Sequence, residues 1–139
     1  KKGYVKTRKE AFSKYLGKGS IGYIPRKKIS ASDAIQMIKK AKGIPVLAHP
    51  GISFLNDQLD DIVNLGLEGI EVWHPDHNLT LIDYFYNYSQ KNNLIMTGGT
   101  DWHGDKNYKS LNYFDLPYEN ILRMKKIKKD NLDPLYQNC

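Results

Sequence analysis

The chain has 139 residues, of which 40% are hydrophobic and 26% are charged, and this composition is ordinary for about one globular domain. Its apolar runs are far shorter than the ~18 residues that a membrane-spanning helix requires, so we expect no membrane association. The single cysteine, Cys139, excludes an internal disulfide and fits a reducing compartment, so we expect a cytoplasmic protein.

The chain opens with Lys1-Lys2-Gly3 instead of methionine, and no apolar segment of a signal peptide follows these charges. We therefore expect residue 1 to lie inside a longer natural protein. The net charge is +6, and much of the excess lies in residues 1–28 and 123–129. These basic segments are interpreted either as solvated surface or as regions that attract a phosphorylated substrate.

Two helices are predicted first in chain order. Residues 10–16 have the spacing of a short amphipathic helix, which the glycines that follow it end. Ser30 is a typical N-cap, and Asp33 three residues later completes a capping-box pattern. A second helix is therefore predicted after Ser30, with Gly43 in the C′ position that ends it.

Short apolar segments then alternate with helical patterns. Residues 44–48 are predicted to form a strand that is buried on both faces. A helix over residues 57–67 precedes a strand at 70–73, and a helix over 80–92 precedes a strand at 94–97. This succession predicts an α/β fold with parallel strands and crossover helices.

The last part of the chain is less regular. Residues 111–118 are predicted to hold one more short strand, and residues 119–129 a basic helix. No segment has the composition of a domain linker, so residues 1–139 are assigned to a single domain.

The positions of the histidines give the first indication of chemistry. The chain has four, His49, His74, His77 and His103, and each lies just past a predicted strand. Functional side chains gather at the carboxyl ends of parallel strands, because the loops there converge on one face of the sheet. The sequence therefore predicts one shared site at these strand ends.

Asp101-Trp-His103 is the most informative element of this set. In an extended segment, residues i and i+2 point to the same side, so Asp101 and His103 are able to reach one site. Carboxylate and imidazole donors suit Mn²⁺, Zn²⁺ or Fe²⁺. The alternative is an ordinary loop in which Asp101 caps a turn and His103 is exposed. His49, followed by Pro50, is a weaker candidate when taken alone.

Other catalytic classes find little support. The chain has no G-x-S-x-G nucleophile elbow, and Cys139 is terminal, so a serine or cysteine nucleophile is not indicated. No glycine-rich phosphate loop opens a helix after a strand. The cysteines that a zinc finger needs are absent.

Together these segments resemble the later motifs of the polymerase and histidinol phosphatase (PHP) superfamily, and most of all its stand-alone bacterial phosphoesterases. The resemblance covers residues 3–122. It rests on Ala48-His49-Pro50, Gly69-Ile-Glu-Val72, Gly98-Gly-Thr-Asp-Trp-His-Gly104, Tyr23-Ile-Pro25 and Leu116-Pro-Tyr-Glu119.

The resemblance implies a distorted (β/α)7 barrel that binds two or three divalent metal ions, such as Mn, Fe or Zn, at the strand ends. It implies metal ligation by His49, His77, Asp101 and His103, with Asp101 and His103 central to catalysis. His74 is the candidate for substrate binding. The implied substrates are phosphate esters of nucleotides or short RNA.

The earlier motifs of the family are missing, since no histidine precedes His49. We therefore expect residues 1–139 to be the C-terminal portion of a PHP domain that needs its N-terminal half as a partner. Two other hypotheses stay open at this point. The first is that the chain is a non-catalytic fragment that associates through exposed strand edges, and the second is that it is a basic nucleic-acid-binding module.

Overall fold

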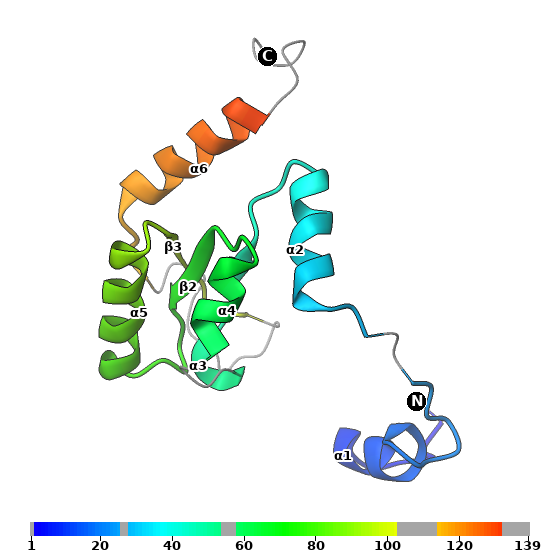
Figure 1. Ribbon diagram of the computed structural model, residues 1–139. Coiled ribbons are helices and arrows are strands. Elements are labelled where there is room, and N and C mark those ends of the chain that lie inside the picture. Colours follow the sequence, from blue (N-terminus) through cyan, green and yellow to red (C-terminus); the bar gives the residue numbers. More distant parts are fainter. Residues whose placement is uncertain (1, 26–27, 54–57, 103–113, 132–139) are drawn as a thin grey trace.

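The computed structural model describes residues 2–25, 28–53, 58–102 and 114–131. Each strand is both preceded and followed by a helix (Figure 1). The elements are α1 (Arg8–Ala11), the π-helix η1 (Phe12–Leu16), α2 (Ala31–Lys40), β1 (Val46–Leu47), α3 (Pro50–Ser53), α4 (Leu59–Asn64), β2 (Gly69–Trp73), α5 (Leu79–Lys91), β3 (Ile95–Gly98) and α6 (Tyr118–Asn131).

The strands form one parallel sheet in the order β1-β2-β3. Val46 pairs with Gly69, which in turn pairs with Ile95, so the three strands begin at the same level. The predicted α/β class with parallel strands and crossover helices is confirmed for the described residues. The sheet is open here, so closure into a barrel stays a prediction.

Helices α4 and α5 cover the same face of the sheet. Ile70 and Val72 lie two residues apart on β2 and therefore share this face, together with Met96 of the neighbouring strand. They pack in one buried cluster with Leu59 of α4 and Phe85 of α5. This cluster holds the sheet and its crossover helices together, and it fixes the level at which each strand ends.

The prediction for residues 44–48 was wrong in length and burial. Strand β1 has only two residues, and both are half-buried. Pro45 carries no backbone N–H, although its carbonyl oxygen accepts hydrogen bonds from Glu68 and Gly69. Within the described residues β1 pairs only with β2, so its other edge has no strand beside it.

Helix α2 begins as its sequence predicts. The Ser30 hydroxyl accepts from the Asp33 N–H at 3.0 Å and donates to the Asp33 carboxylate at 2.7 Å. Its end differs from the prediction, because Lys42 and not Gly43 takes the left-handed C′ position, with φ of 60°. The Gly43 N–H bonds to the Ile38 carbonyl, which makes Gly43 the C″ residue of a Schellman turn.

Helices α5 and α6 match the predicted ranges closely. Helix α6 is tied to β3 by two side chains: the Asn120 amide oxygen accepts from the Met96 N–H, and Arg123 donates to the Asn93 and Leu94 carbonyls. The strand predicted at 111–118 falls partly outside the described residues. Residues 114–117 are not a strand, and Tyr118 begins α6.

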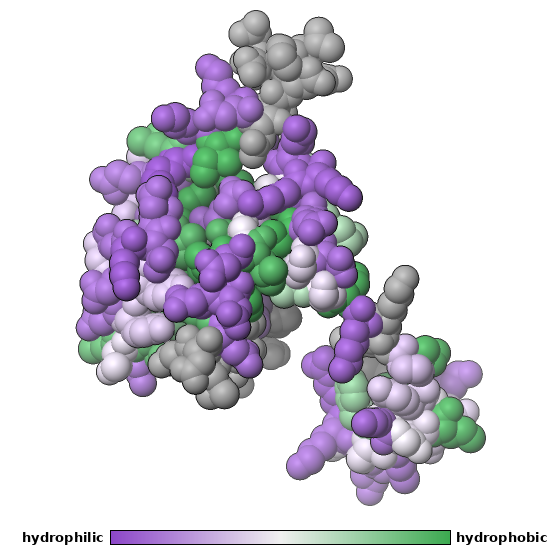
Figure 2. Space-filling model, in the orientation of Figure 1, coloured by the Kyte–Doolittle hydropathy of each residue, from purple (hydrophilic) through white to green (hydrophobic). Residues whose placement is uncertain are grey.

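The N-terminal segment lies apart from the sheet (Figure 1). The helix predicted at 10–16 is present as the end of α1 followed by η1, but neither element contains a buried residue. Both hydrophobic and hydrophilic side chains are exposed on the face of this segment seen in Figure 2. None of the described helices is long and apolar enough to cross a membrane.

The central cluster gives a matched stability test. Leu59 is 1% exposed and Leu79 is 79% exposed, so one substitution can be compared at two adjacent helices. We expect Leu59→Ala to lower the free energy of unfolding of the full-length protein by about 2–5 kcal/mol. Leu79→Ala should change it by less than about 0.5 kcal/mol. Urea denaturation measures both, and equal effects would contradict the packing described here.

Candidate functional site

Three parallel strands deliver polar side chains to one edge of the sheet. His49 follows β1, His74 follows β2, and Asp101 follows β3. The ring centroids of His49 and His74 are 5.6 Å apart, and those of His74 and His77 are 5.4 Å apart. The structure therefore brings three of the predicted histidines together, while His103 lies outside the described residues.

His49 has an unusual backbone for a residue with a side chain. Its φ is 33°, in the left-handed region that costs a non-glycine residue on the order of 1–3 kcal/mol. Its N–H donates to the Glu71 carboxylate at 2.7 Å. The charge-assisted hydrogen bond to Glu71 offsets part of the strain, and it sets the direction in which the chain leaves β1.

Asp101 has the same backbone feature at the end of β3. Its φ is 48°. The other non-glycine residues with positive φ in the described chain are Lys42 and Asn93, and both are the C′ residues of Schellman turns, where this conformation is ordinary. His49 and Asp101 have no such explanation. Strained backbone of this kind gathers at functional sites, which supports these two residues as candidates.

His77 is buried, and both of its ring nitrogens are bonded to the backbone. Nδ1 lies 2.8 Å from the Val72 carbonyl oxygen, and Nε2 accepts the Gly51 N–H at 3.2 Å. A carbonyl can only accept and an N–H can only donate. These bonds therefore require a neutral imidazole with its proton on Nδ1. The ring also packs against Phe85, with centroids 5.2 Å apart.

His74 has the opposite tautomer. Its Nδ1 accepts the Asp76 N–H at 3.2 Å, so in the neutral ring the proton is on Nε2. That Nε2 is buried and has no hydrogen-bond partner among the described residues, and the same is true of His49 Nδ1. A buried polar atom without a partner is rare and costly, so each of these nitrogens is suited to bind a ligand.

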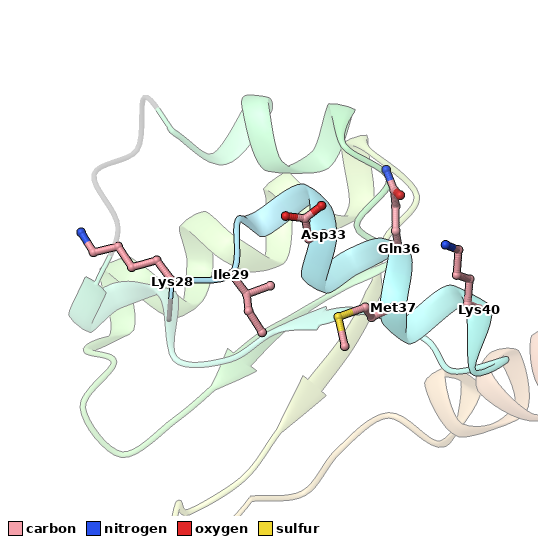
Figure 3. A pocket seen from close by; sticks show the side chains of 6 residues that line it. All are labelled: Lys28, Ile29, Asp33, Gln36, Met37 and Lys40. Carbon is pink, nitrogen blue, oxygen red and sulfur yellow. The ribbon is translucent and has the colours of Figure 1, made fainter. Parts of the chain in front are cut away.

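A hollow of about 540 Å³ lies beside the loop that follows β2, and His74, His77, Asn78 and Ile82 are part of its lining, whereas His49 and Asp101 are not. Another hollow, of about 420 Å³, lies on the outer side of α2 between Lys28, Asp33 and Lys40, and it contains no imidazole (Figure 3). The hollow beside the strand ends is therefore the candidate substrate site.

Within the described residues, no group of three histidine, cysteine, aspartate or glutamate side chains is arranged to enclose a metal ion. His49 and Asp101 are therefore candidate donors to a site that needs further donors. Sequence reasoning missed Glu71, which lies inside β2 on the face opposite Ile70 and Val72. A lone charged residue in a five-residue apolar strand was the signal that could have identified it.

The strain at His49 can be measured with two variants that both remove the imidazole. His49→Gly relieves the left-handed backbone, whereas His49→Ala keeps its Cβ. In the metal-free full-length protein we expect the Gly variant to be more stable than the Ala variant by about 1 kcal/mol, in thermal or urea unfolding. An Ala variant that is equally stable or more stable would contradict the conformation described for His49.

Comparison with known proteins gives consistent matches, although no family model matches the chain. Over 76 residues the chain is 41% identical to the phosphoribosyl 1,2-cyclic phosphate 1,2-diphosphodiesterase of Eggerthella lenta, covering 55% of this chain and 29% of that protein. Over 106 residues it is 32% identical to the 3′,5′-nucleoside bisphosphate phosphatase of Chromobacterium violaceum, covering 73% of this chain and 37% of that protein.

Two solved structures also match most of the chain. A protein from Bifidobacterium adolescentis, assigned as a metal-dependent phosphoesterase, matches 93% of the chain with a TM-score of 0.69 and 27% identity. An amidohydrolase from Chromobacterium violaceum, solved with bound sulfate and no metal, matches 87% with a TM-score of 0.58 and 28% identity.

The chain spans 46% of each of these two structures, and less than half of either curated relative. Because the matched relatives are phosphoesterases of the kind that the sequence motifs resemble, the chain belongs to the PHP superfamily.

Proposed function

We propose that this chain supplies one part of the active site of a divalent-metal-dependent phosphoesterase. The observation that carries the proposal is that His49, His74 and Asp101 follow three adjacent parallel strands, and that the buried His49 Nδ1 and His74 Nε2 have no hydrogen-bond partner among the described residues. The matches to a phosphodiesterase and a phosphatase support the same reaction class.

The donor groups of His49 and Asp101 are of the chemical types that bind a divalent metal ion. Imidazole and carboxylate donors suit Mn²⁺, Fe²⁺ or Zn²⁺. His49 offers a ring nitrogen on a fixed backbone, and Asp101 offers a carboxylate from the end of β3. His103 is the further donor that the sequence predicts from this chain. His77 was expected to be a donor as well, but its ring nitrogens already have backbone partners.

Bound divalent cations would lower the pKa of an attacking water and balance the charge of the phosphate. The residues of this chain would orient the reactants. His49 and Asp101 would direct their donor atoms from strained, fixed backbone positions. Such preorganisation lowers the cost of assembling the site at the moment of reaction.

His74 is suited to hold the substrate. Its neutral ring carries the proton on Nε2, because Nδ1 accepts from Asp76. A nitrogen that carries a proton cannot ligate a metal, but it can donate a hydrogen bond to a phosphate oxygen. A phosphate in the hollow that His74 lines would give the buried Nε2 a partner, which it does not have among the described residues. This assignment agrees with the substrate-binding role expected for His74.

We propose phosphate esters of nucleotides or short RNA as the substrates. The Chromobacterium violaceum relative is a nucleoside bisphosphate phosphatase, and a third relative, matched over 49 residues at 41% identity, is the 5′-3′ exoribonuclease Rnm of Salmonella typhimurium. The match to the exoribonuclease covers only 17% of that protein, so it supports the substrate class without choosing a substrate.

We further propose that residues 1–139 are the C-terminal portion of one PHP domain with a (β/α)7 barrel, active in the cytoplasm. In the part of the chain that the structure describes, no strand lies beside the second edge of β1, and this supports the arrangement because a strand from the preceding half would pair there. The chain alone would then lack part of the metal site.

The metal site can be tested by elemental analysis of the full-length protein. We expect Asp101→Asn to lose bound metal and to lower phosphatase activity by about 100-fold or more. Removing a residue that only orients a metal ligand already costs about 10- to 100-fold, so the loss of a ligand should cost at least the upper value. Asp83→Asn, the same change on the exposed surface of α5, is the control. Full metal content in Asp101→Asn would contradict the assignment.

The role of His74 has a separate kinetic signature. We expect His74→Phe to keep the metal content of the full-length protein and to raise KM for a nucleotide monophosphate ester by about tenfold, since one hydrogen bond to a charged group is lost. Steady-state kinetics with parallel metal analysis measure both quantities. Loss of metal with no change in KM would show that His74 is a metal donor instead.

A further inference from the structure

The turn that carries His49 is held from two sides by β2 and the loop that follows it. We call residues 49–51 the His49 turn. On one side the His49 N–H donates to Glu71 Oε2 at 2.7 Å. On the other side the Gly51 N–H donates to His77 Nε2 at 3.2 Å. Both acceptors come from residues far along the chain, so these contacts fix tertiary position as well as local shape.

His77 is itself fixed in place. Its Nδ1–H donates to the Val72 carbonyl at 2.8 Å, so the ring links the end of β2 to the first turn of α3. The approach to Gly51 is very close, since a Cβ on that residue would lie 2.7 Å from His77 Cδ2 and 3.0 Å from Nε2. Only glycine fits at this position without displacing the ring.

Glu71 occupies the space between the outer strand ends. Its Oε2 accepts from His49 after β1, and its Oε1 lies 3.1 Å from the position that a Cβ would take on Gly99 after β3. The Gly99 N–H in turn donates to the Trp73 carbonyl at 3.0 Å. The Glu71 carboxylate on the middle strand therefore bonds to the residue that follows β1 and lies close to Gly99, which follows β3.

We propose that Glu71 and His77 are positioning residues that hold the His49 turn in place, with His49 in its left-handed conformation, and thereby aim the His49 imidazole. The proposal rests on the proposed metal-dependent function. It assigns His77 a role through the backbone, because ligation of a metal by Nε2 would require breaking its bond to Gly51. It assigns Glu71 an orienting role through its bond to the His49 N–H.

The first arm of the test is amide hydrogen exchange in the metal-free full-length protein. Glu71→Leu should speed exchange of the His49 amide by about tenfold, the effect of one lost charge-assisted bond. Glu71→Gln keeps an oxygen acceptor and should have a smaller effect. Glu68→Gln is the control, because Glu68 precedes β2 and pairs with Lys39 at 3.1 Å, away from the site. Unchanged exchange in Glu71→Leu would overturn the proposal.

His77 is tested with a matched pair. The amide of glutamine can both donate to Val72 and accept from Gly51, so His77→Gln should preserve slow exchange at Gly51, whereas His77→Phe should speed it. If His77→Phe does not fold, His77→Gln still decides between the roles. Retention of metal by His77→Gln supports positioning, and loss of metal with unchanged Gly51 exchange shows direct ligation and overturns it.

The second arm is the dissociation constant for Mn²⁺, measured by calorimetry. Positioning predicts that the dissociation constant for Mn²⁺ is about tenfold higher in Glu71→Leu and His77→Phe. The increase should be smaller in the conservative variants Glu71→Gln and His77→Gln. Faster amide exchange in the His49 turn with an unchanged affinity for Mn²⁺ would overturn the proposal that Glu71 and His77 aim the His49 imidazole. If the wild-type protein binds no Mn²⁺, the proposed function fails, while the exchange arm still reports whether the two residues hold the turn.

Discussion

Parallel pairing of three short strands is the constraint on which the candidate site depends. Because Val46, Gly69 and Ile95 are in register, the segments that follow β1, β2 and β3 leave the sheet at one edge. The register is maintained by a single apolar cluster on the face covered by α4 and α5. The chain positions of His49 and Asp101 are 52 residues apart in sequence, and both therefore follow strands that end at the same edge.

The polar groups at this edge divide into those that satisfy the backbone and those that lack a partner. Glu71 and His77 bond to main-chain groups of the His49 turn, whereas His49 Nδ1 and His74 Nε2 are buried and have no hydrogen-bond partner in the described part of the chain. The fold thus keeps strained backbone and unsatisfied imidazole together in one place. Such a combination is unfavourable for stability alone, and it is typical of a site that is completed by a ligand.

Periodicity and capping patterns predicted most of the helices and strands, because those signals are local: Ser30 and Asp33 cap α2 as expected. What the sequence could not reveal is of two kinds, the exact residue at which a local turn forms and the tertiary contacts. Lys42 takes the C′ position that was predicted for Gly43, because helix α2 ends one residue earlier and the Gly43 N–H makes the C″ bond of the Schellman turn. The bond between Glu71 and the His49 N–H follows from the approach of β1 to β2, which no local pattern encodes. The tautomers of His74 and His77 depend on which backbone groups their rings meet, and the sequence does not specify these partners.

The most direct test of this account is a crystal structure of the full-length protein soaked in Mn²⁺, with anomalous scattering used to locate the ions. The account predicts anomalous peaks within bonding distance of His49 and Asp101, with His77 still bonded to Gly51 and Val72, and with His74 Nε2 facing the phosphate position. Peaks at other residues, or a Mn²⁺ ion bound to His77 with the His49 turn rearranged, would contradict it.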